Sequence, residues 1–148
     1  MNSDRVNKRV LRDIKLLMKN ELYQVNVIDT KNVTCNIRGP KDTVYENGKW
    51  KINIQFPDNY PYKSPSVGFL DKIYHPNVDL PSGSICLNVL NTAWSPIYTA
   101  EHIVETFIPQ LLTYPNPDDP LNVEAASLLQ ENIEEFNKKV KSYITNED

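Results

Sequence analysis

The chain of 148 residues lacks any long apolar run, because apolar residues never exceed three in a row, as at residues 16–18 and 85–87. A membrane-spanning helix needs about 20 such residues, and the core of a secretory signal needs about 7 to 15. We therefore expect a soluble, unsecreted protein without a membrane partner. We expect a cytoplasmic location, with the nucleus as a further compartment consistent with the sequence.

An excess of one charge sign is also missing, since 16 Lys and Arg face 19 Asp and Glu, for a formal net charge of −3. Broad binding of nucleic acid or of anionic membranes needs a strongly basic surface. The mild acidity therefore argues against nucleic acid as a partner. With 40% hydrophobic and 24% charged residues, the composition is that of an ordinary globular domain, and we predict a single domain over residues 1–148.

Cysteine and histidine are scarce, with two of each: Cys35, Cys86, His75 and His102. Their spacing matches no zinc motif, so we predict no metal site. Two cysteines are too few for a disulfide framework, and we expect both thiols to stay reduced. A Cys–His hydrolase is disfavoured, because His75 precedes a proline and His102 lies off the apolar stripe of a predicted helix.

Proline is unevenly distributed, since ten of the eleven prolines lie between residues 57 and 120. Regular structure is therefore predicted mainly on either side of this segment. Before it, apolar residues at three- and four-residue spacing from Val6 to Met18 predict a helix, with Ser3 or Asp4 as its cap. Alternating apolar residues predict half-buried strands at residues 23–27, 33–37, 50–56 and 66–70.

Turn signals separate the first three predicted strands at residues 29–32, 39–40 and 47–48. Strands joined in this way form an antiparallel meander. Apolar stripes at residues 103–112 and 128–144 predict C-terminal helices, the first kinked or broken by Pro109. The predicted fold class is therefore α+β, with an N-terminal helix, a four-stranded antiparallel meander sheet and C-terminal helices.

Cys86 is the candidate nucleophile, because it lies in the irregular proline-rich segment, whereas Cys35 is in phase with the core residues of a strand. A thiol of reference pKa about 8.5 is a few per cent thiolate at neutral pH, which suffices for exchange with an activated thioester. Asn77 is a candidate donor to an oxyanion, and Asp118 or Asp119 is a candidate carboxylate for an incoming amine. The structural alternatives are that Cys86 is a buried thiol, that the Asn77 amide holds the loop before Cys86, and that Asp118 and Asp119 form a solvated turn or a helix cap.

Four motifs resemble, in their order and spacing, the signature of ubiquitin-conjugating enzymes over residues 8 to about 145. They are His75-Pro76-Asn77, Cys86-Leu87, Trp94-Ser95-Pro96 and Pro117-Asp118-Asp119-Pro120-Leu121. The resemblance implies that Cys86 accepts ubiquitin as a thioester from the activating enzyme and transfers it to substrate lysines, usually with a ubiquitin ligase. It also implies that Asn77 supports the oxyanion and that Asp119 positions or deprotonates the lysine.

The resemblance further implies residues that contact the partner proteins. Those that meet the activating enzyme are Lys8, Arg9 and Arg12. Those that dock the ligase are Tyr62, Ser95 and Pro96. No bound cofactor is expected, because ATP is consumed by the upstream activating enzyme.

Among the branches of the family, the chain is most similar to the H type, which pairs with the yeast ligase called GID. The residues that carry this similarity are 62–69, 108–112 and 114–117, together with one additional residue between Asn77 and Cys86. The chain departs from the branch at Ser95-Pro96, where typical H-type members have Thr-Ala.

Two related functions remain as alternatives. One is a conjugating enzyme for another ubiquitin-like modifier, although the net charge of −3 speaks against the strongly basic SUMO type. The other is a non-catalytic ubiquitin-binding variant of the same fold, although such variants lack the cysteine, and here both Cys86 and Asn77 are present.

Overall fold

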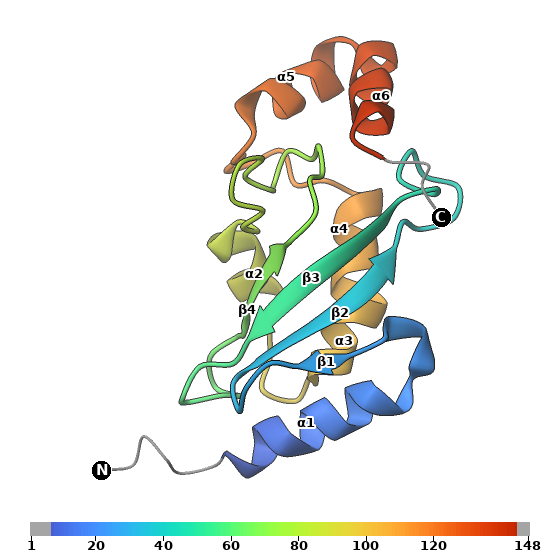
Figure 1. Ribbon diagram of the computed structural model, residues 1–148. Helices are drawn as coiled ribbons and strands as arrows, with labels where there is room; N and C mark the ends of the chain where they lie inside the picture. The colour runs from blue at the N-terminus through green and yellow to red at the C-terminus, as the bar shows by residue number, and fades with distance from the viewer. Residues whose placement is uncertain (1–6, 145–148) are drawn as a thin grey trace.

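The computed structural model describes residues 7–144, in which a helix is followed by four strands and then by further helices (Figure 1). The strands are β1 (Asn26–Val27), β2 (Asn32–Arg38), β3 (Lys49–Gln55) and β4 (Ser66–Phe69). They form one sheet in the order β1-β2-β3-β4, and every neighbouring pair is antiparallel. The predicted α+β fold with a four-stranded meander is confirmed.

Helix α1 (Lys8–Lys19) lies across one end of the sheet (Figure 1). Its N-cap is Asn7, whose side-chain oxygen accepts the backbone N–H groups of Arg9 and Val10. An asparagine at this position satisfies backbone donors that the helix itself leaves free. The predicted caps Ser3 and Asp4 lie outside the described residues, and the prediction began the helix too early.

The first strand is shorter than the predicted span of residues 23–27. Residues Glu21–Tyr23 form the 3₁₀ helix η1, and only Asn26–Val27 pair with β2. Between them Gln24 has a φ of 46°, a left-handed conformation that interrupts a strand. Tyr23 and Val25 still pack partly buried against the core, whereas Val27 pairs with β2 and is exposed, so the alternation predicted burial correctly only at the first two positions.

The two central strands build the core face of the sheet. Their register pairs Val33 with Ile54, Cys35 with Ile52 and Ile37 with Trp50, all of them buried. Cys35 is therefore a core residue, as predicted, and burial raises the pKa of its thiol to about 12. Both cysteines are free thiols.

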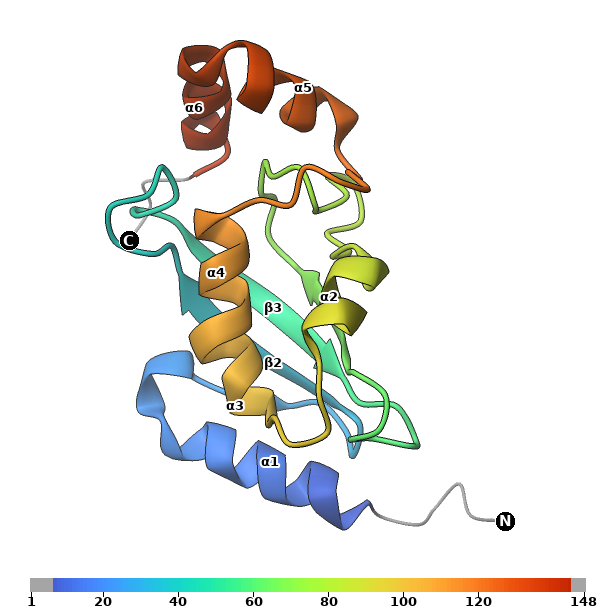
Figure 2. The ribbon, with the colours of Figure 1, turned by 180° about the vertical axis from the view of Figure 1, so that it is seen from behind.

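A helical column covers this core face of the sheet (Figure 2). It consists of α3 (Ala100–His102), the π-helical segment η2 (Ile103–Phe107) and α4 (Ile108–Thr113). Of the predicted kink or break at Pro109, the break is wrong, because the column continues through this residue. The N–H of Ile108 bonds to the carbonyl of Ile103, five residues back, and this wider turn places Pro109, which has no N–H, at the start of α4.

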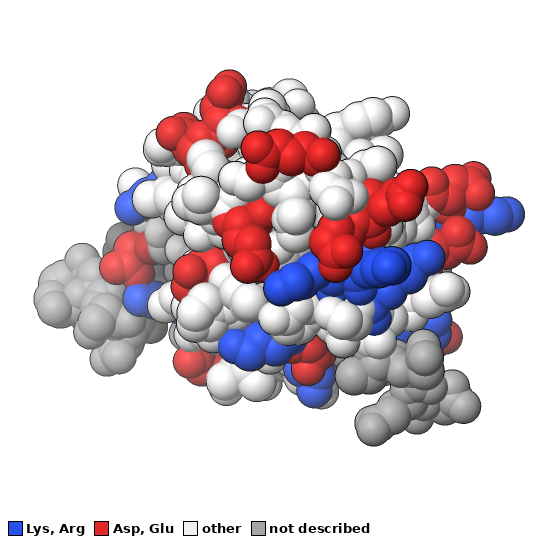
Figure 3. Space-filling model, turned by 90° about the horizontal axis from the view of Figure 1, so that it is seen from above, with Lys and Arg blue, Asp and Glu red and all other residues white. Residues whose placement is uncertain are grey.

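Helices α5 (Val123–Glu131) and α6 (Ile133–Ser142) form the end of the molecule opposite α1 and confirm the predicted closing helices (Figure 1). On the face seen from above, acidic and basic side chains are mixed (Figure 3). Of the helices within residues 7–144, none combines the length and the apolar character that a membrane crossing requires.

Candidate active site

Cys86 immediately precedes α2 (Leu87–Ala93), a seven-residue helix that the sequence analysis missed inside the proline-rich segment. The backbone N–H of Cys86 donates to the carbonyl oxygen of Asn77 at 3.0 Å, and the Cys86 carbonyl accepts the N–H of Leu90. Cys86 is 6% exposed, while the next two residues, Leu87 and Asn88, are exposed. The thiol therefore lies at the rim of the packed interior.

The chain between Asn77 and Cys86 is folded tightly against β4. Short antiparallel bridges join Val78 to Ile85 and Gly68 to Ser84. Gly83 has a φ of 78°, and a Cβ on it would lie 1.8 Å from the carbonyl oxygen of Phe69. Glycine is therefore required at this turn, because a side chain would collide with the sheet backbone. The turn carries Cys86 back beside Asn77.

Asn77 is fully buried, and its side chain binds the backbone of Asn116 at both ends. Its Nδ2 donates to the Asn116 carbonyl at 2.8 Å, and its Oδ1 accepts the Asn116 N–H at 2.8 Å. The loop that follows α4 is thereby fixed to the segment that bears Cys86. The side chain of Asn77 thus holds the loop of Asn116, and one hydrogen on Nδ2 lies outside this pair of bonds.

His75 supports Asn77 from the interior. Its Nδ1 accepts the backbone N–H of Asn77 at 3.0 Å, and its Nε2 lies 2.8 Å from the carbonyl oxygen of Leu111. A ring that accepts at Nδ1 is neutral and carries its hydrogen on Nε2, which donates to Leu111. Burial lowers the pKa of His75 to about 4. His75 is thus a neutral structural group, which gives the thiol no general base.

Asp119 lies on the loop that Asn77 and Pro76 hold. The carbonyl oxygen of Pro76 accepts the N–H groups of Leu121 at 2.9 Å and Asn122 at 3.0 Å, so the loop is fixed on both sides of Asp119. Asp119 is exposed and has a φ of 54°, and no hydrogen bond to its carboxylate is found among residues 7–144. The fold therefore brings the loops of Cys86, Asn77 and Asp119 together and leaves the Asp119 carboxylate free at the surface.

Tyr62 and Pro96, two of the predicted ligase contacts, are exposed on neighbouring loops, and Ser95 beside them is half-buried. Trp94 joins the loops, because its Nε1 donates to the carbonyl of Pro61 at 2.8 Å and its ring lies 5.6 Å from that of Tyr60. The sequence analysis also missed Ile97, an exposed apolar residue next to Pro96. An isoleucine within a short proline loop was the available signal.

The sequence profile of ubiquitin-conjugating enzymes matches residues 8–144. The chain belongs to this family. Ubiquitin-conjugating enzyme E2 5 of Arabidopsis thaliana is 50% identical over 139 residues, which cover 93% of this chain and 75% of that protein. Ubiquitin-conjugating enzyme E2-24 kDa of Saccharomyces cerevisiae is 50% identical over 140 residues, which cover 93% of this chain and 63% of that protein.

Solved structures of ubiquitin-conjugating enzymes share the fold. The E2 domain of a Toxoplasma gondii ubiquitin conjugating enzyme matches with a TM-score of 0.80 at 32% identity, covering 93% of this chain and 94% of that one. Members of the family work with ubiquitin, an activating enzyme and ubiquitin ligases. Within residues 7–144, no group of three or more His, Cys, Asp or Glu side chains is arranged to hold a metal ion.

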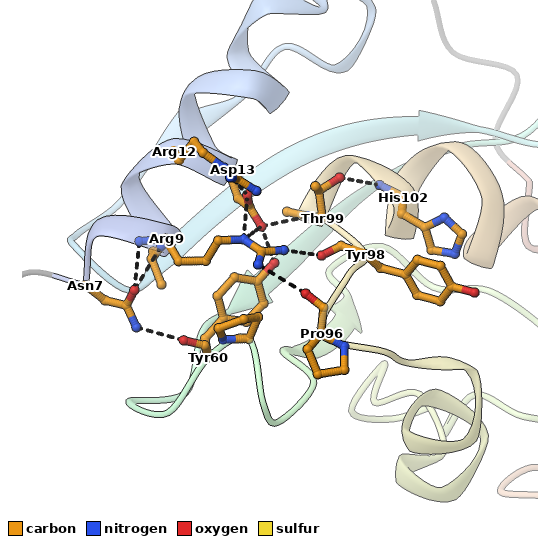
Figure 4. A network of polar contacts seen from close by, with 12 residues as sticks. Asn7, Arg9, Arg12, Asp13, Tyr60, Pro96, Tyr98, Thr99 and His102 are labelled. Carbon is orange, nitrogen blue, oxygen red and sulfur yellow. Dashed lines mark hydrogen bonds and ion pairs between the residues drawn. The ribbon is translucent and has the colours of Figure 1, made fainter.

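The basic residues of α1 differ in orientation in this ubiquitin-conjugating enzyme. Lys8 and Arg12 are exposed, the Arg12 side chain by 61%. The Arg9 side chain is 21% exposed and turns into a network of polar contacts with Asp13 and with the loop that contains Pro96 (Figure 4). The three predicted contacts for the activating enzyme therefore do not form one uniform basic surface.

Proposed function

We propose that this enzyme accepts ubiquitin from the activating enzyme as a thioester on Cys86 and transfers it to substrate lysines, usually with a ubiquitin ligase. One observation carries the proposal: Asn77 bonds through its backbone to Cys86 and through its side chain to the loop of Asp119. Hydrogen bonds thus join the segments that carry the thiol, the amide and the carboxylate. ATP would be consumed by the activating enzyme, and no bound cofactor is required here.

Charging exchanges one thioester for another. The Sγ of Cys86 attacks the carbonyl carbon of the arriving thioester, a new C–S bond forms, and the thiolate of the activating enzyme leaves. The attacking and leaving groups are both thiolates of similar basicity, so the exchange needs no separate general base.

Transfer to lysine places different demands on the site. The amine nitrogen forms a C–N bond and loses a proton, the oxyanion forms and collapses, and the Sγ of Cys86 leaves as the thiolate. The second hydrogen on the Nδ2 of Asn77 would be donated to the oxyanion. The exposed carboxylate of Asp119 would orient the lysine or accept its proton.

The partner surfaces follow from exposure. Lys8 and Arg12 offer cationic contacts to the activating enzyme, whereas the guanidinium of Arg9 between them is committed to internal contacts. Tyr62, Ser95 and Pro96 are proposed to dock the ligase, and the exposed Ile97 extends that surface.

Within the family we propose the H type. The support is the similarity in residues 62–69, 108–112 and 114–117, and the additional residue between Asn77 and Cys86, which lies in the segment that turns at Gly83. A ligase of the GID kind should then accelerate discharge of the charged enzyme more than unrelated ligases do. Equal acceleration by all of them would contradict the H-type assignment.

The decisive experiment for the main proposal is incubation with an activating enzyme, ATP and each ubiquitin-like modifier in turn, followed by non-reducing electrophoresis. We expect an adduct with ubiquitin that disappears on addition of a thiol reductant. An adduct with another modifier alone would establish the first alternative. No adduct from the folded protein, together with binding of free ubiquitin, would establish the non-catalytic alternative.

A further inference from the structure

We propose that Arg9 is a positioning residue for ligase docking, because its guanidinium holds residues 95–98 against α1 and thereby sets the geometry of the docking surface, defined as Tyr62, Ser95 and Pro96. The proposal rests on the function proposed above for that surface. It assigns to Arg9 a task that differs from a direct contact with the activating enzyme.

The guanidinium of Arg9 binds three groups at once (Figure 4). Its Nε donates to the carboxylate of Asp13, at 3.1 Å from Oδ1 and 3.3 Å from Oδ2. Its Nη1 donates to the carbonyl oxygen of Pro96 at 3.1 Å, and its Nη2 donates to the carbonyl oxygen of Tyr98. One cation on α1 thus binds the backbone of a loop that lies 87 and 89 residues further along the chain.

Asp13 extends the same network to the second docking loop. Its side chain is fully buried, and Oδ2 accepts the hydroxyl of Tyr60 and the N–H of Ala100. Burial, and the hydrogen bond to Asp13, raise the pKa of Tyr60. Tyr60 is two residues before Tyr62, so both docking loops converge on the Arg9–Asp13 pair.

The loop has few backbone bonds of its own, although the Tyr98 ring stacks on His102 at 3.9 Å and lies 6.2 Å from the Trp94 ring. Within residues 95–98, the backbone bond found besides those to Arg9 is from the N–H of Tyr98 to the carbonyl of Ser95 at 2.9 Å. Pro96 has no N–H to donate, and Ile97 is exposed. Loops with few internal bonds take their position from the side chains that bind them. Residue 9 therefore controls where Pro96 stands relative to Tyr62.

Arginine is suited to this task and lysine is not. A planar guanidinium presents donors in fixed directions and can bridge a carboxylate and two carbonyls, whereas an ammonium is a single point of donation on a flexible stem. Arg12 provides a comparison on the same helix, because its Nε lies 3.6 Å from Asp13 and no hydrogen bond or ion pair is found between its side chain and residues 95–98.

The test compares Arg9→Lys with the matched variant Arg12→Lys. Arg9→Lys keeps a cation beside the buried Asp13, which avoids the large destabilisation expected when a buried charge loses its partner. Hydrogen–deuterium exchange is measured on the enzyme that carries no ubiquitin, at the backbone amides of Tyr98 and Ala100. The amide of Ile52 in β3 is the reference. For Arg9→Lys we expect exchange at Tyr98 and Ala100 to rise about tenfold or more, with a change of less than about twofold at Ile52.

The second readout compares two rates of single-turnover ubiquitin transfer from the enzyme to lysine, one with and one without a ligase RING domain that stimulates the wild-type enzyme. Their ratio measures the stimulation by the ligase. Charging is completed beforehand, so contacts with the activating enzyme do not enter the ratio. Arg9→Lys should lower this stimulation several-fold, and Arg12→Lys should retain it. Arg9→Ala combined with Asp13→Asn, which removes both charges, should lower it at least as much.

Four outcomes would overturn the proposal: unchanged exchange at Tyr98, an equal rise in exchange at Ile52, the same effects in Arg12→Lys, or full ligase stimulation despite a loosened loop. Failure of the proposed function is recognised separately, because a wild-type enzyme that accepts no ubiquitin would still give the exchange result. Unchanged exchange in an enzyme that charges normally would reject the role of Arg9 alone.

Discussion

The loop around Cys86 and the loops of the docking surface are all irregular, and buried polar side chains hold each of them in place. These side chains are uncharged near Cys86 and charged at the docking surface. Near Cys86 the supporting groups are neutral. The side-chain amide of Asn77 forms hydrogen bonds with the backbone of Asn116, and the neutral ring of His75 accepts the backbone N–H of Asn77. At the docking surface the support is charged, with Arg9 paired to the buried Asp13. In both regions a side chain from one segment satisfies backbone groups of another.

The difference has a chemical consequence. A buried neutral amide or imidazole needs only its hydrogen bonds, whereas a buried charge must also keep its partner. The neutral support itself adds no fixed charge beside the thiol, and the two acidic side chains of the neighbouring loop, Asp118 and Asp119, are exposed. Chemistry and docking therefore rest on separate supports, and variants should separate them.

The largest expected effect is at Cys86. Cys86→Ala should abolish the reducible ubiquitin adduct, because the nucleophile is gone, while Cys35→Ala should retain it wherever the fold survives. Cys86→Ser should form an oxyester that resists reductant and reacts more slowly with amines. Non-reducing electrophoresis after charging distinguishes these results. An adduct that survives in Cys86→Ala would place the chemistry elsewhere.

Asn77→Ala should next reduce discharge to lysine by about 10²- to 10³-fold, the usual effect of removing an oxyanion donor, with near-normal charging. The variant also removes both bonds to Asn116, so the loop of Asp119 should exchange its amide hydrogens faster. Single-turnover charging and discharge are measured separately. Equal losses in the two steps would contradict the assignment to aminolysis.

The neutral support also predicts a pH dependence of stability. The pKa of His75 is lowered from 6.5 to about 4 in the folded protein, so between these values the unfolded chain binds a proton that the folded chain does not. Stability should therefore fall as pH is lowered from about 6.5 to about 4, by about 3 kcal/mol in total. Urea unfolding across this range checks the slope. His75→Gln should flatten it, and His102→Gln should leave this component intact.

The sequence predicted the elements that depend on local periodicity. The apolar stripe of α1, the alternation of β2 and β3 and the in-phase position of Cys35 are each confirmed, because burial on one face imposes a period that neighbours share. Prediction was wrong where local pattern and tertiary context differ. Tyr23 is partly buried by packing without being in a strand. Pro109 is accommodated by a π-helical turn, which leaves no pattern in the side chains from which it could be predicted.

The site residues could be chosen from the sequence, but their contacts could not. Asn77 was singled out by its motif, while its bonds to Asn116 join residues 39 positions apart. Arg9 was predicted, from the resemblance to ubiquitin-conjugating enzymes, as one of three cations that meet the activating enzyme. Its inward turn depends on Pro96 and Tyr98, whose carbonyls carry no sequence signal because every residue has one.

Tyr62 and Tyr114 test whether docking is confined to one region, because they are exposed to similar degrees, 80% and 77%, on different loops. Tyr62→Ala should weaken ligase affinity by about 1 to 3 kcal/mol, as expected for an aromatic anchor in a small interface. Charging should be nearly unchanged. Tyr114→Ala should leave ligase affinity as it is. Titration of a labelled ligase domain measures both, and an unchanged affinity in Tyr62→Ala would contradict a role for Tyr62 in docking.

The smallest expected effect is at Asp119, whose carboxylate is exposed and therefore weakly coupled to the thiol. Asp119→Asn is the suitable change, because asparagine tolerates the left-handed φ of 54°, and Asp118→Asn is the matched control. Lysine discharge should slow about tenfold near neutral pH, which is less than the roughly 10²- to 10⁴-fold contribution typical of a general base, because the carboxylate is exposed. The loss should shrink as pH rises toward the lysine reference pKa of about 10.4, because more of the attacking amine is then already neutral.

A loss that stays constant to strongly alkaline pH would assign positioning alone to Asp119. The double variant Asn77→Ala/Asp119→Asn then decides how the two residues are related. If Asn77 acts mainly by holding the loop of Asp119, the second change should add little to the first. If Asn77 donates to the oxyanion while Asp119 serves the amine, the two rate losses should multiply, because they affect separate parts of one transition state.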